Sequence, residues 1–276
     1  MKLCRFQPLE FPAKELSRSP HPFHPQARAG IVEDGAVFEI RGELWGERER
    51  TGASWPLNSV KLLPPSSPSK IVCVGRNYFE HAKELGNEAP KEPLIFLKPP
   101  SSVIAPEEPI VLPRVSQRVD YEGELAIIIG RRCYQPRAGE SVLPCILGYT
   151  CLNEVTARDL QKLDVQFTRA KGFDTFCPFG PVLETSLDLT KATVETFVNG
   201  SRKQYGYTSQ MIFSLDVIIR FVAQVMTLEP GDVIATGTPS GVGPLSSGDV
   251  VEVSVSGIGS LRNPVIGPQD ADAPED

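Results

Sequence analysis

The sequence predicts an α+β protein that is mostly β. Of its 276 residues, 26 are proline, about twice the average share. Proline interrupts helix interiors and central strands, which argues against an all-α fold. The turns Asp34-Gly35 and Asn199-Gly200 each separate two β-prone runs and so predict hairpins. With 41% hydrophobic residues, the chain is long and apolar enough to bury a sizeable core.

Residues 1–65 are predicted to form a small N-terminal β-rich domain. Their first part is rich in proline and contains His21 and His24, two of the three histidines. That pair could bind a metal ion, although a surface loop explains it better. The Asp-Gly turn within residues 31–40 predicts a hairpin, and the proline- and serine-rich residues 63–69 predict a linker to the rest of the chain.

Residues 66–266 are predicted to form the larger domain, in which strands outnumber helices. The runs that predict strands are residues 71–75, 94–97, 124–129, 231–234 and 248–251. The spacing of apolar residues predicts a short helix over residues 78–85 and a longer one after Ser214, a typical N-cap residue. Residues 267–276 carry four acidic side chains and no core pattern, so we expect a flexible tail.

The charge and the apolar pattern exclude several classes of function. The 34 Asp and Glu residues outnumber the 28 Lys and Arg residues, and no basic run offers the local patch that nucleic-acid or anionic-membrane binding requires. No apolar stretch reaches the roughly 18–20 residues of a membrane span, and the N-terminus lacks a signal-peptide pattern. We therefore expect a cytoplasmic protein that binds neither nucleic acid nor membrane. The six cysteines form no CxxC pair, which predicts free buried thiols and no zinc site.

Three glutamates are candidate metal ligands. Glu122 and Glu124 alternate along a predicted strand, so they point to the same side just before an apolar run. Buried there, the two carboxylates would repel each other, and a divalent cation would offset that cost. An exposed strand end with both carboxylates solvated is an equally good explanation. Glu154 supplies a third carboxylate, and three oxygen ligands suit Mg²⁺ or Mn²⁺.

Two further segments carry candidate catalytic groups. His81 and Glu84 lie three residues apart on the predicted short helix, so a carboxylate could orient the imidazole as a general base. A histidine on a short helix is nevertheless more often structural or solvated. Lys171 lies among apolar and aromatic residues, where it could simply extend its ammonium to water. The glycine-rich residues 236–243 could bind an anion or form a tight structural turn.

In this order along the chain, six segments resemble the fumarylacetoacetate hydrolase superfamily. They are VGRNY at 74–78, FLKP at 96–99, YEGEL at 121–125, VTARD at 155–159, KGFDTF at 171–176 and TGTPSGVG at 236–243. The resemblance spans roughly residues 70–265. It implies a mixed β-sandwich roll, commonly a homodimer, that carries Mg²⁺ or Mn²⁺ on three carboxylates. The N-terminal residues match only the habit of family members to carry a small extra β domain.

The resemblance also assigns roles to individual residues. The metal ligands would be Glu122, Glu124 and Glu154, the catalytic residues His81, Glu84 and Lys171, and the substrate contacts Arg76, Gln161 and Thr238. The family's third ligand is normally Asp, and this chain has Glu154 instead. We expect its extra methylene still to reach the metal, with altered geometry or bidentate binding.

The resemblance predicts a small 2-oxo acid as substrate. The leading hypothesis is hydrolysis of a C–C bond in an acylpyruvate-like 2,4-dioxo acid, through an enolate held by the metal. The alternative within the family is an isomerase or decarboxylase of aromatic catabolism. It would act on 2-hydroxyhepta-2,4-diene-1,7-dioate, on 5-oxopent-3-ene-1,2,5-tricarboxylate or on oxaloacetate. A third hypothesis is a non-catalytic protein of this fold that binds a metal and an oxo acid.

Overall fold

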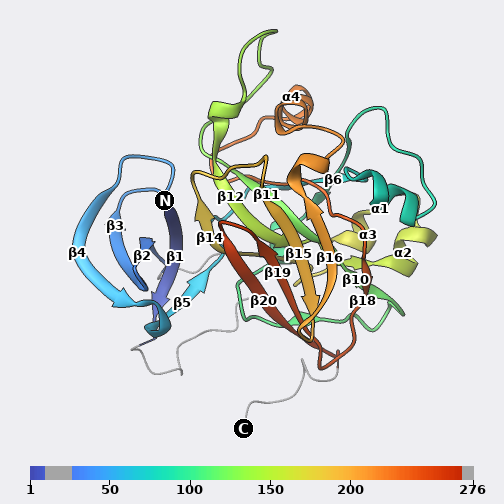
Figure 1. Ribbon diagram of the computed structural model, residues 1–276, viewed down its shortest axis with the longest axis horizontal. Coiled ribbons are helices and arrows are strands. Elements are labelled where there is room, and N and C mark those ends of the chain that lie inside the picture. The colour runs from blue at the N-terminus through green and yellow to red at the C-terminus, as the bar shows by residue number, and fades with distance from the viewer. Residues whose placement is uncertain (10–26, 269–276) are drawn as a thin grey trace.

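A computed structural model describes residues 1–9 and 27–268 of the chain. His21, His24 and most of the predicted acidic tail lie outside these residues. The predicted class is confirmed, because strands account for most of the regular structure and the helices are short (Figure 1). Among the described residues, no helix is long and apolar enough to cross a membrane.

One long sheet runs through the molecule and includes the N-terminal strands (Figure 1). In spatial order it contains β4 (Glu49–Pro56), β3 (Ala36–Arg41), β2 (Arg28–Glu33), β1 (Lys2–Pro8), β14 (Cys177–Glu184), β12 (Ile146–Asn153), β11 (Gly123–Ile129), β17 (Val233–Ala235), β6 (Ile71–Gly75) and β7 (Leu94–Lys98). Off this path, β5 (Val60–Leu63) pairs with β1, and β8 (Val103–Ile104) pairs with β14.

A second sheet packs across the first, in front of it in Figure 1. It contains β16 (Ser201–Tyr207), β15 (Thr193–Val198), β19 (Val250–Val255), β20 (Gly259–Ile266) and β9 (Ile110–Val111). A small third sheet contains β13 (Thr156–Ala157), β10 (Val119–Tyr121) and β18 (Gly243–Pro244). Leu125 and Cys151 of the long sheet meet Val194 and Val253 of the second sheet in one apolar cluster. Two sheets packed over a shared apolar layer agree with the expected sandwich.

The helices are α1 (Phe79–Glu84), α2 (Arg158–Leu163), α3 (Thr168–Lys171) and α4 (Leu215–Val225). Single 3₁₀ turns cover η2 (Leu57–Ser59), η3 (Pro100–Ser102), η4 (Leu143–Cys145) and η5 (Thr208–Gln210). The helix predicted after Ser214 is confirmed as α4, and the Ser214 side chain accepts a hydrogen bond from the Val217 N–H. Both predicted hairpin turns are present, with Asp34, Gly35, Asn199 and Gly200 all at positive φ.

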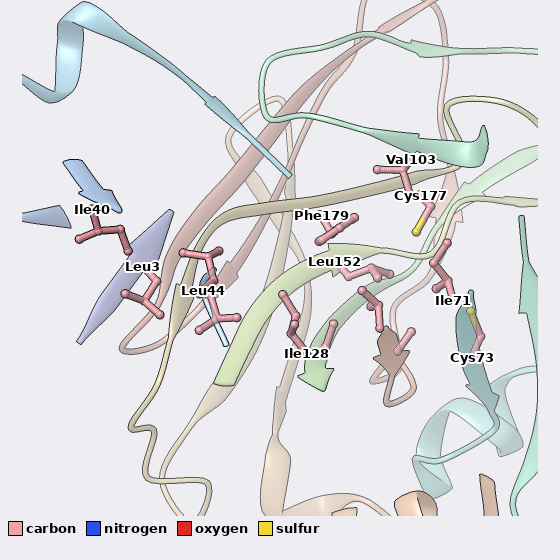
Figure 2. Packing of buried hydrophobic residues seen from close by; sticks show 14 residues of the cluster. Leu3, Ile40, Leu44, Ile71, Cys73, Val103, Ile128, Leu152, Cys177 and Phe179 are labelled. Carbon is pink, nitrogen blue, oxygen red and sulfur yellow. The ribbon is translucent and has the colours of Figure 1, made fainter. Parts of the chain in front are cut away.

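The opposite face of the long sheet carries a core that the N-terminal strands share with the rest (Figure 2). Leu3 and Ile40 belong to the same buried cluster as Ile128 and Phe179. The segment predicted as a linker is packed against this body, since the Ser66 hydroxyl donates to the Gly231 carbonyl at 2.7 Å. The boundary near residue 65 stays a prediction. In the structure, the two parts share one sheet and one core.

Candidate active site

The three candidate metal ligands come together at the ends of two neighbouring strands. Glu124 lies on β11, Glu122 immediately precedes it, and Glu154 follows β12. The strands pair so that Gly123 faces Asn153, and the Glu154 N–H donates to the Glu122 carbonyl at 2.8 Å. One ligand oxygen from each glutamate lies within 4.8 Å of the others. All three side chains are buried, so the exposed strand end considered above is excluded.

Gly123 explains why both glutamates point the same way. A Cβ atom on Gly123 would lie 2.0 Å from the Thr196 hydroxyl of the second sheet. That face of the strand therefore accepts no side chain at this position, and its neighbours Glu122 and Glu124 project to the opposite side. The packing of the two sheets therefore requires glycine at position 123, between the two candidate ligands.

Buried cations compensate part of the negative charge, and Lys171 and Arg158 are two of them. The Lys171 ammonium contacts Glu154, lies 3.4 Å from a Glu122 oxygen and donates to the Thr156 hydroxyl at 2.6 Å. It is only 2% exposed, so it does not extend to water. The Arg158 guanidinium contacts Glu122 from another side. Lys171 therefore holds its charge inside the protein against two carboxylates.

The three carboxyl groups differ electrostatically. Burial alone would raise the pKa of Glu122, but the charges of Lys171 and Arg158 outweigh it and hold this pKa well below its ordinary value. Burial, with the nearby carboxylates of Glu154 and Glu122, raises the pKa of Glu124 far above its ordinary value. Among the described residues, the one hydrogen bond to Glu124 comes from the Gly237 N–H at 2.7 Å. A cation bound beside Glu124 would compensate the remaining negative charge of the three glutamates.

The glutamates fit a hard divalent cation. Glu154 Oε1 is buried and accepts no hydrogen bond from the described residues. Lys98 Nζ lies 2.8 Å from it, yet the three N–H groups of Lys98 go to backbone carbonyls. Those acceptors are Val155 at 2.8 Å, Lys171 at 2.6 Å and Phe176 at 2.9 Å. An oxygen with spare lone pairs beside two further carboxylates could hold Mg²⁺ or Mn²⁺.

His81 lines a cavity of about 230 Å³ beside the glutamates. Its Nδ1 lies 3.5 Å from a Glu84 oxygen, which is too long for a strong hydrogen bond. Glu84 instead accepts the Gly241 N–H with both oxygens at 3.1 Å, joining α1 to the glycine-rich turn. Burial lowers the pKa of His81, opposed by the charge of Glu122. The lowered pKa favours the neutral imidazole that a general base requires.

Most of the predicted site residues meet in this cavity. Those that line it are Arg76, His81, Glu122, Glu124, Glu154, Gln161 and Thr238. Lys171 and Glu84 stand behind its wall, each touching a lining residue. The geometry thus assembles the predicted set, and the role of each residue stays a prediction.

The predicted substrate contacts differ in whether they already form hydrogen bonds within the protein. Gln161 Oε1 accepts from Arg158 at 2.6 Å. The Thr238 hydroxyl donates to the Gly123 carbonyl at 2.8 Å. Arg76, at φ 58°, forms no hydrogen bond or ion pair with the described part of the chain, so its guanidinium can accept an anionic ligand at little cost.

Sequence reasoning missed three buried residues that build the site. Lys98 directly follows a predicted strand and anchors the backbone around Glu154 and Lys171. Its charge after an apolar run was a usable signal. Asp120 accepts from Arg158 Nε at 2.9 Å. Gln204 of β16 accepts from the Gly123 N–H at 2.9 Å. No local pattern marks Gln204, because its partners lie on another sheet.

Two known families match different parts of the chain. Residues 70–266 match the family described as fumarylacetoacetate (FAA) hydrolase C-terminal. Residues 24–65 match the family described as Rv2993c-like, N-terminal. Oxaloacetate tautomerase YisK of Bacillus subtilis is 42% identical over 226 residues, which cover 76% of this chain and 69% of that protein.

Two solved structures resemble the whole described fold. The 2-hydroxyhepta-2,4-diene-1,7-dioate isomerase of Mycobacterium marinum is 42% identical, with a TM-score of 0.84, covering 97% of this chain and 99% of that one. A fumarylacetoacetate hydrolase from Exiguobacterium antarcticum is 38% identical, with a TM-score of 0.81 and the same coverage. The relatives carry names for different reactions, so the likeness supports the scaffold more than a single reaction.

Proposed function

The chain belongs to the fumarylacetoacetate hydrolase family, and we propose that it catalyses keto–enol tautomerisation of a small 2-oxo dicarboxylic acid. The reaction transfers a proton at the carbon next to the 2-oxo group. The observation that carries this proposal is the cavity itself. It places the His81 imidazole, the Arg76 guanidinium and three buried carboxylates around one space of about 230 Å³. That volume is below the usual range for drug-sized ligands, which favours a compact acid.

His81 is the proposed base. Its neutral imidazole would remove a proton from the carbon next to the 2-oxo group and return it to the oxygen or the carbon. When bound at the glutamates, a divalent cation would supply Lewis-acid polarisation of the 2-oxo group. Burial would lower the pKa of Lys171, but Glu122 and Glu154 raise it above its ordinary value. Lys171 thus stays an ammonium and supplies positive charge where negative charge develops.

Arg76 is proposed to hold the second carboxylate of the substrate. A guanidinium binds a carboxylate through two parallel N–H groups, and Arg76 has no described partner to give up. Tautomerisation needs a proton-transferring group and polarisation of the 2-oxo carbonyl. His81 would supply the first, and a cation held by the glutamates would supply the second. The names of relatives such as the Bacillus subtilis oxaloacetate tautomerase support the same choice.

Hydrolysis of an acylpyruvate-like acid is the second candidate. It is favoured by the Glu84 carboxylate 3.5 Å from His81 Nδ1, because a carboxylate beside an imidazole helps it to activate water. A homodimer in the cytoplasm remains the expectation for either reaction, and analytical ultracentrifugation would check the oligomeric state.

The deciding experiment follows the enol absorbance of oxaloacetate and of acetylpyruvate, with Mg²⁺, with Mn²⁺ and with EDTA, and with metal alone as the control. EDTA-sensitive loss of the oxaloacetate enol without released pyruvate would support the tautomerase. Pyruvate released from acetylpyruvate would favour the hydrolase, and pyruvate from oxaloacetate a decarboxylase. The proposal fails if the protein adds nothing to the metal-alone rate with either acid.

A matched pair of variants tests the metal centre. We expect Glu122→Gln to weaken Mn²⁺ binding at least tenfold in calorimetry, because it removes a charged oxygen ligand. The exposed Glu80 of α1 provides the control, and Glu80→Gln should leave the affinity unchanged. Equal Mn²⁺ affinity in Glu122→Gln and the wild type would overturn the three-glutamate site.

A further inference from the structure

The cavity beside the glutamates has a buried floor and an exposed mouth. Glu122, Glu124 and Glu154 line the cavity and are buried. Among the described residues that line it, Leu85, which follows α1, and Lys162 of α2 are the two that are exposed. An exposed lining residue marks where a cavity meets solvent, so the mouth lies between α1 and α2.

Apolar side chains form the part of the lining that is intermediate in burial. Leu94, Phe96 and Phe167 line the cavity and are half-buried. The two aromatic rings meet edge to face, with their centroids 5.7 Å apart. The lining thus changes from carboxylates on the floor, through apolar side chains, to an ammonium at the mouth. An apolar stretch of this kind suits a short hydrocarbon chain.

The charge of Lys162 is not taken up by the protein. Its ammonium forms no hydrogen bond or ion pair with the described part of the chain, although α2 and its end carry two carboxylates. Asp159 accepts from the Ser116 hydroxyl at 2.6 Å, and Asp164 accepts from Arg169 at 2.8 and 2.6 Å. Both carboxylates therefore have other partners, which leaves the Lys162 ammonium to water or to a ligand.

Arg158, the other cation of α2, shows the opposite arrangement. Its Nε donates to Asp120 at 2.9 Å, and one terminal nitrogen donates to Gln161 at 2.6 Å. The other terminal nitrogen contacts Glu122. Arg158 is thus held in the floor by the protein itself, whereas Lys162 is the cation of this helix that keeps its N–H groups for a ligand.

We infer that Lys162 determines specificity, because it binds the terminal carboxylate of a 2-oxo dicarboxylic acid whose hydrocarbon chain extends from the glutamates to the mouth. The inference rests on the proposed function and makes its substrate class more specific. Arg76 is half-buried and can hold the carboxylate of a short acid. A longer acid passes the apolar lining and reaches Lys162, whose flexible side chain can follow the length of the ligand.

The test compares 2-oxoadipate with 2-oxohexanoate, which have equally long carbon chains and differ only at the far end. There the first acid carries a carboxylate and the second a methyl group. Both are titrated calorimetrically into the Mn²⁺-loaded protein, and we expect the wild type to bind 2-oxoadipate more tightly. Lys162→Met should weaken binding of 2-oxoadipate about fivefold and that of 2-oxohexanoate less than about twofold, because one exposed ion pair is lost.

Lys83→Met is the matched control. Lys83 is an exposed lysine of α1 that does not line the cavity, so its loss changes the net charge equally without touching the mouth. We expect the affinities for both acids to stay within about twofold of the wild type. In Lys162→Met the Mn²⁺ affinity should also stay unchanged, because the exposed ammonium contacts none of the three glutamates.

Two further measurements follow the sign and the range of the interaction. Lys162→Glu should weaken binding of 2-oxoadipate more than Lys162→Met does, because the two carboxylates would repel each other. Raising the salt concentration should reduce the wild-type preference for 2-oxoadipate, since exposed charges are screened, and should change Lys162→Met much less.

Equal losses of both acids in Lys162→Met would overturn the inference, as would a loss that follows a drop in Mn²⁺ affinity. An equal loss of 2-oxoadipate in Lys83→Met would reduce the effect to net charge and overturn it too. So would a wild type that binds 2-oxoadipate no better than 2-oxohexanoate, or that binds neither at millimolar concentration. These binding measurements are independent of turnover. Selective loss of 2-oxoadipate without turnover of any acid would sink the proposed reaction alone, and turnover with equal losses would sink only the role of Lys162.

Discussion

The two walls of the cavity differ in how completely their charged atoms are paired. On the carboxylate wall, formed by Glu122, Glu124 and Glu154, buried cations and backbone N–H groups already contact most oxygens. On the α1 wall, to which Arg76 and His81 contribute, Arg76 has no described hydrogen-bond or ion-pair partner and His81 Nδ1 forms no hydrogen bond. The fold therefore arranges one wall before any ligand arrives, while the other keeps hydrogen-bonding capacity for the ligand.

The largest effect should come from breaking the carboxylate wall. Lys171→Met leaves Glu122 and Glu154 without their shared ammonium. Because one partner of a buried ion pair is lost, we expect the metal-free protein to lose about 3–5 kcal/mol of unfolding free energy. Urea denaturation measures this loss. The matched control is Lys162→Met, since Lys162 lines the same cavity but is exposed, and it should cost less than about 0.5 kcal/mol. Similar losses of unfolding free energy in Lys171→Met and Lys162→Met would contradict this view of the carboxylate wall.

A substitution on the α1 wall should lower the reaction rate more than the unfolding free energy. His81→Ala removes the proposed base, so we expect kcat to fall by about 10²–10⁴. Unfolding free energy should fall far less than in Lys171→Met, because no hydrogen bond to Nδ1 is lost. Steady-state rates and urea denaturation on the same preparation separate the two effects. Full activity in His81→Ala would show that another group is the base.

The pH profile gives an independent view of the same residue. His81 acts as a base only when neutral, and burial lowers its pKa below the ordinary 6.5. We therefore expect the wild-type rate to be constant through neutral pH and to fall only below pH 6.5, as the imidazole takes up a proton. Rates measured between pH 5 and pH 8 check this. An acid limb with its midpoint above pH 6.5 would contradict the assignment.

A smaller effect is expected for the substrate contact on the α1 wall. Arg76→Leu should raise KM for a 2-oxo dicarboxylate about 10- to 100-fold, because a charge-assisted hydrogen bond contributes roughly 1.5–3 kcal/mol. KM for a 2-oxo monocarboxylate of similar size should change little, which makes it the internal control. Equal increases for both acids would mean that Arg76 does not select the second carboxylate.

The smallest effect is expected from Glu84→Gln. The amide oxygen can still accept the Gly241 N–H, so α1 keeps its connection to the glycine-rich turn. The lost charge no longer supports protonated His81, so the acid limb should move to still lower pH, with less than a tenfold change in kcat. An upward shift of that limb would show that Glu84 acts on His81 in another way.

Sequence reasoning reached the carboxylate wall because its signal is local. The Glu-Gly-Glu alternation on a strand predicts that both carboxylates share a side, and the apolar run that follows predicts burial. The choice between a buried pair and a solvated strand end depended on what covers the strand, which the pattern alone does not contain. The roles of Lys98 and Gln204 were not predicted for the same reason. Gln204 meets Gly123 across 81 residues of sequence, through the packing of two sheets.

The pairing of β1 with β14 has a consequence for how the chain can be divided. Lys2 and Leu3 lie beside Glu184 and Leu183, so the first strand covers one margin of the body. A fragment that starts after residue 65 would leave this margin of β14 bare, and it would open the shared cluster around Phe179 to water. Uncovered strand margins pair with other chains. We therefore expect a shortened version without β1 to be less stable and more prone to aggregate than the whole chain.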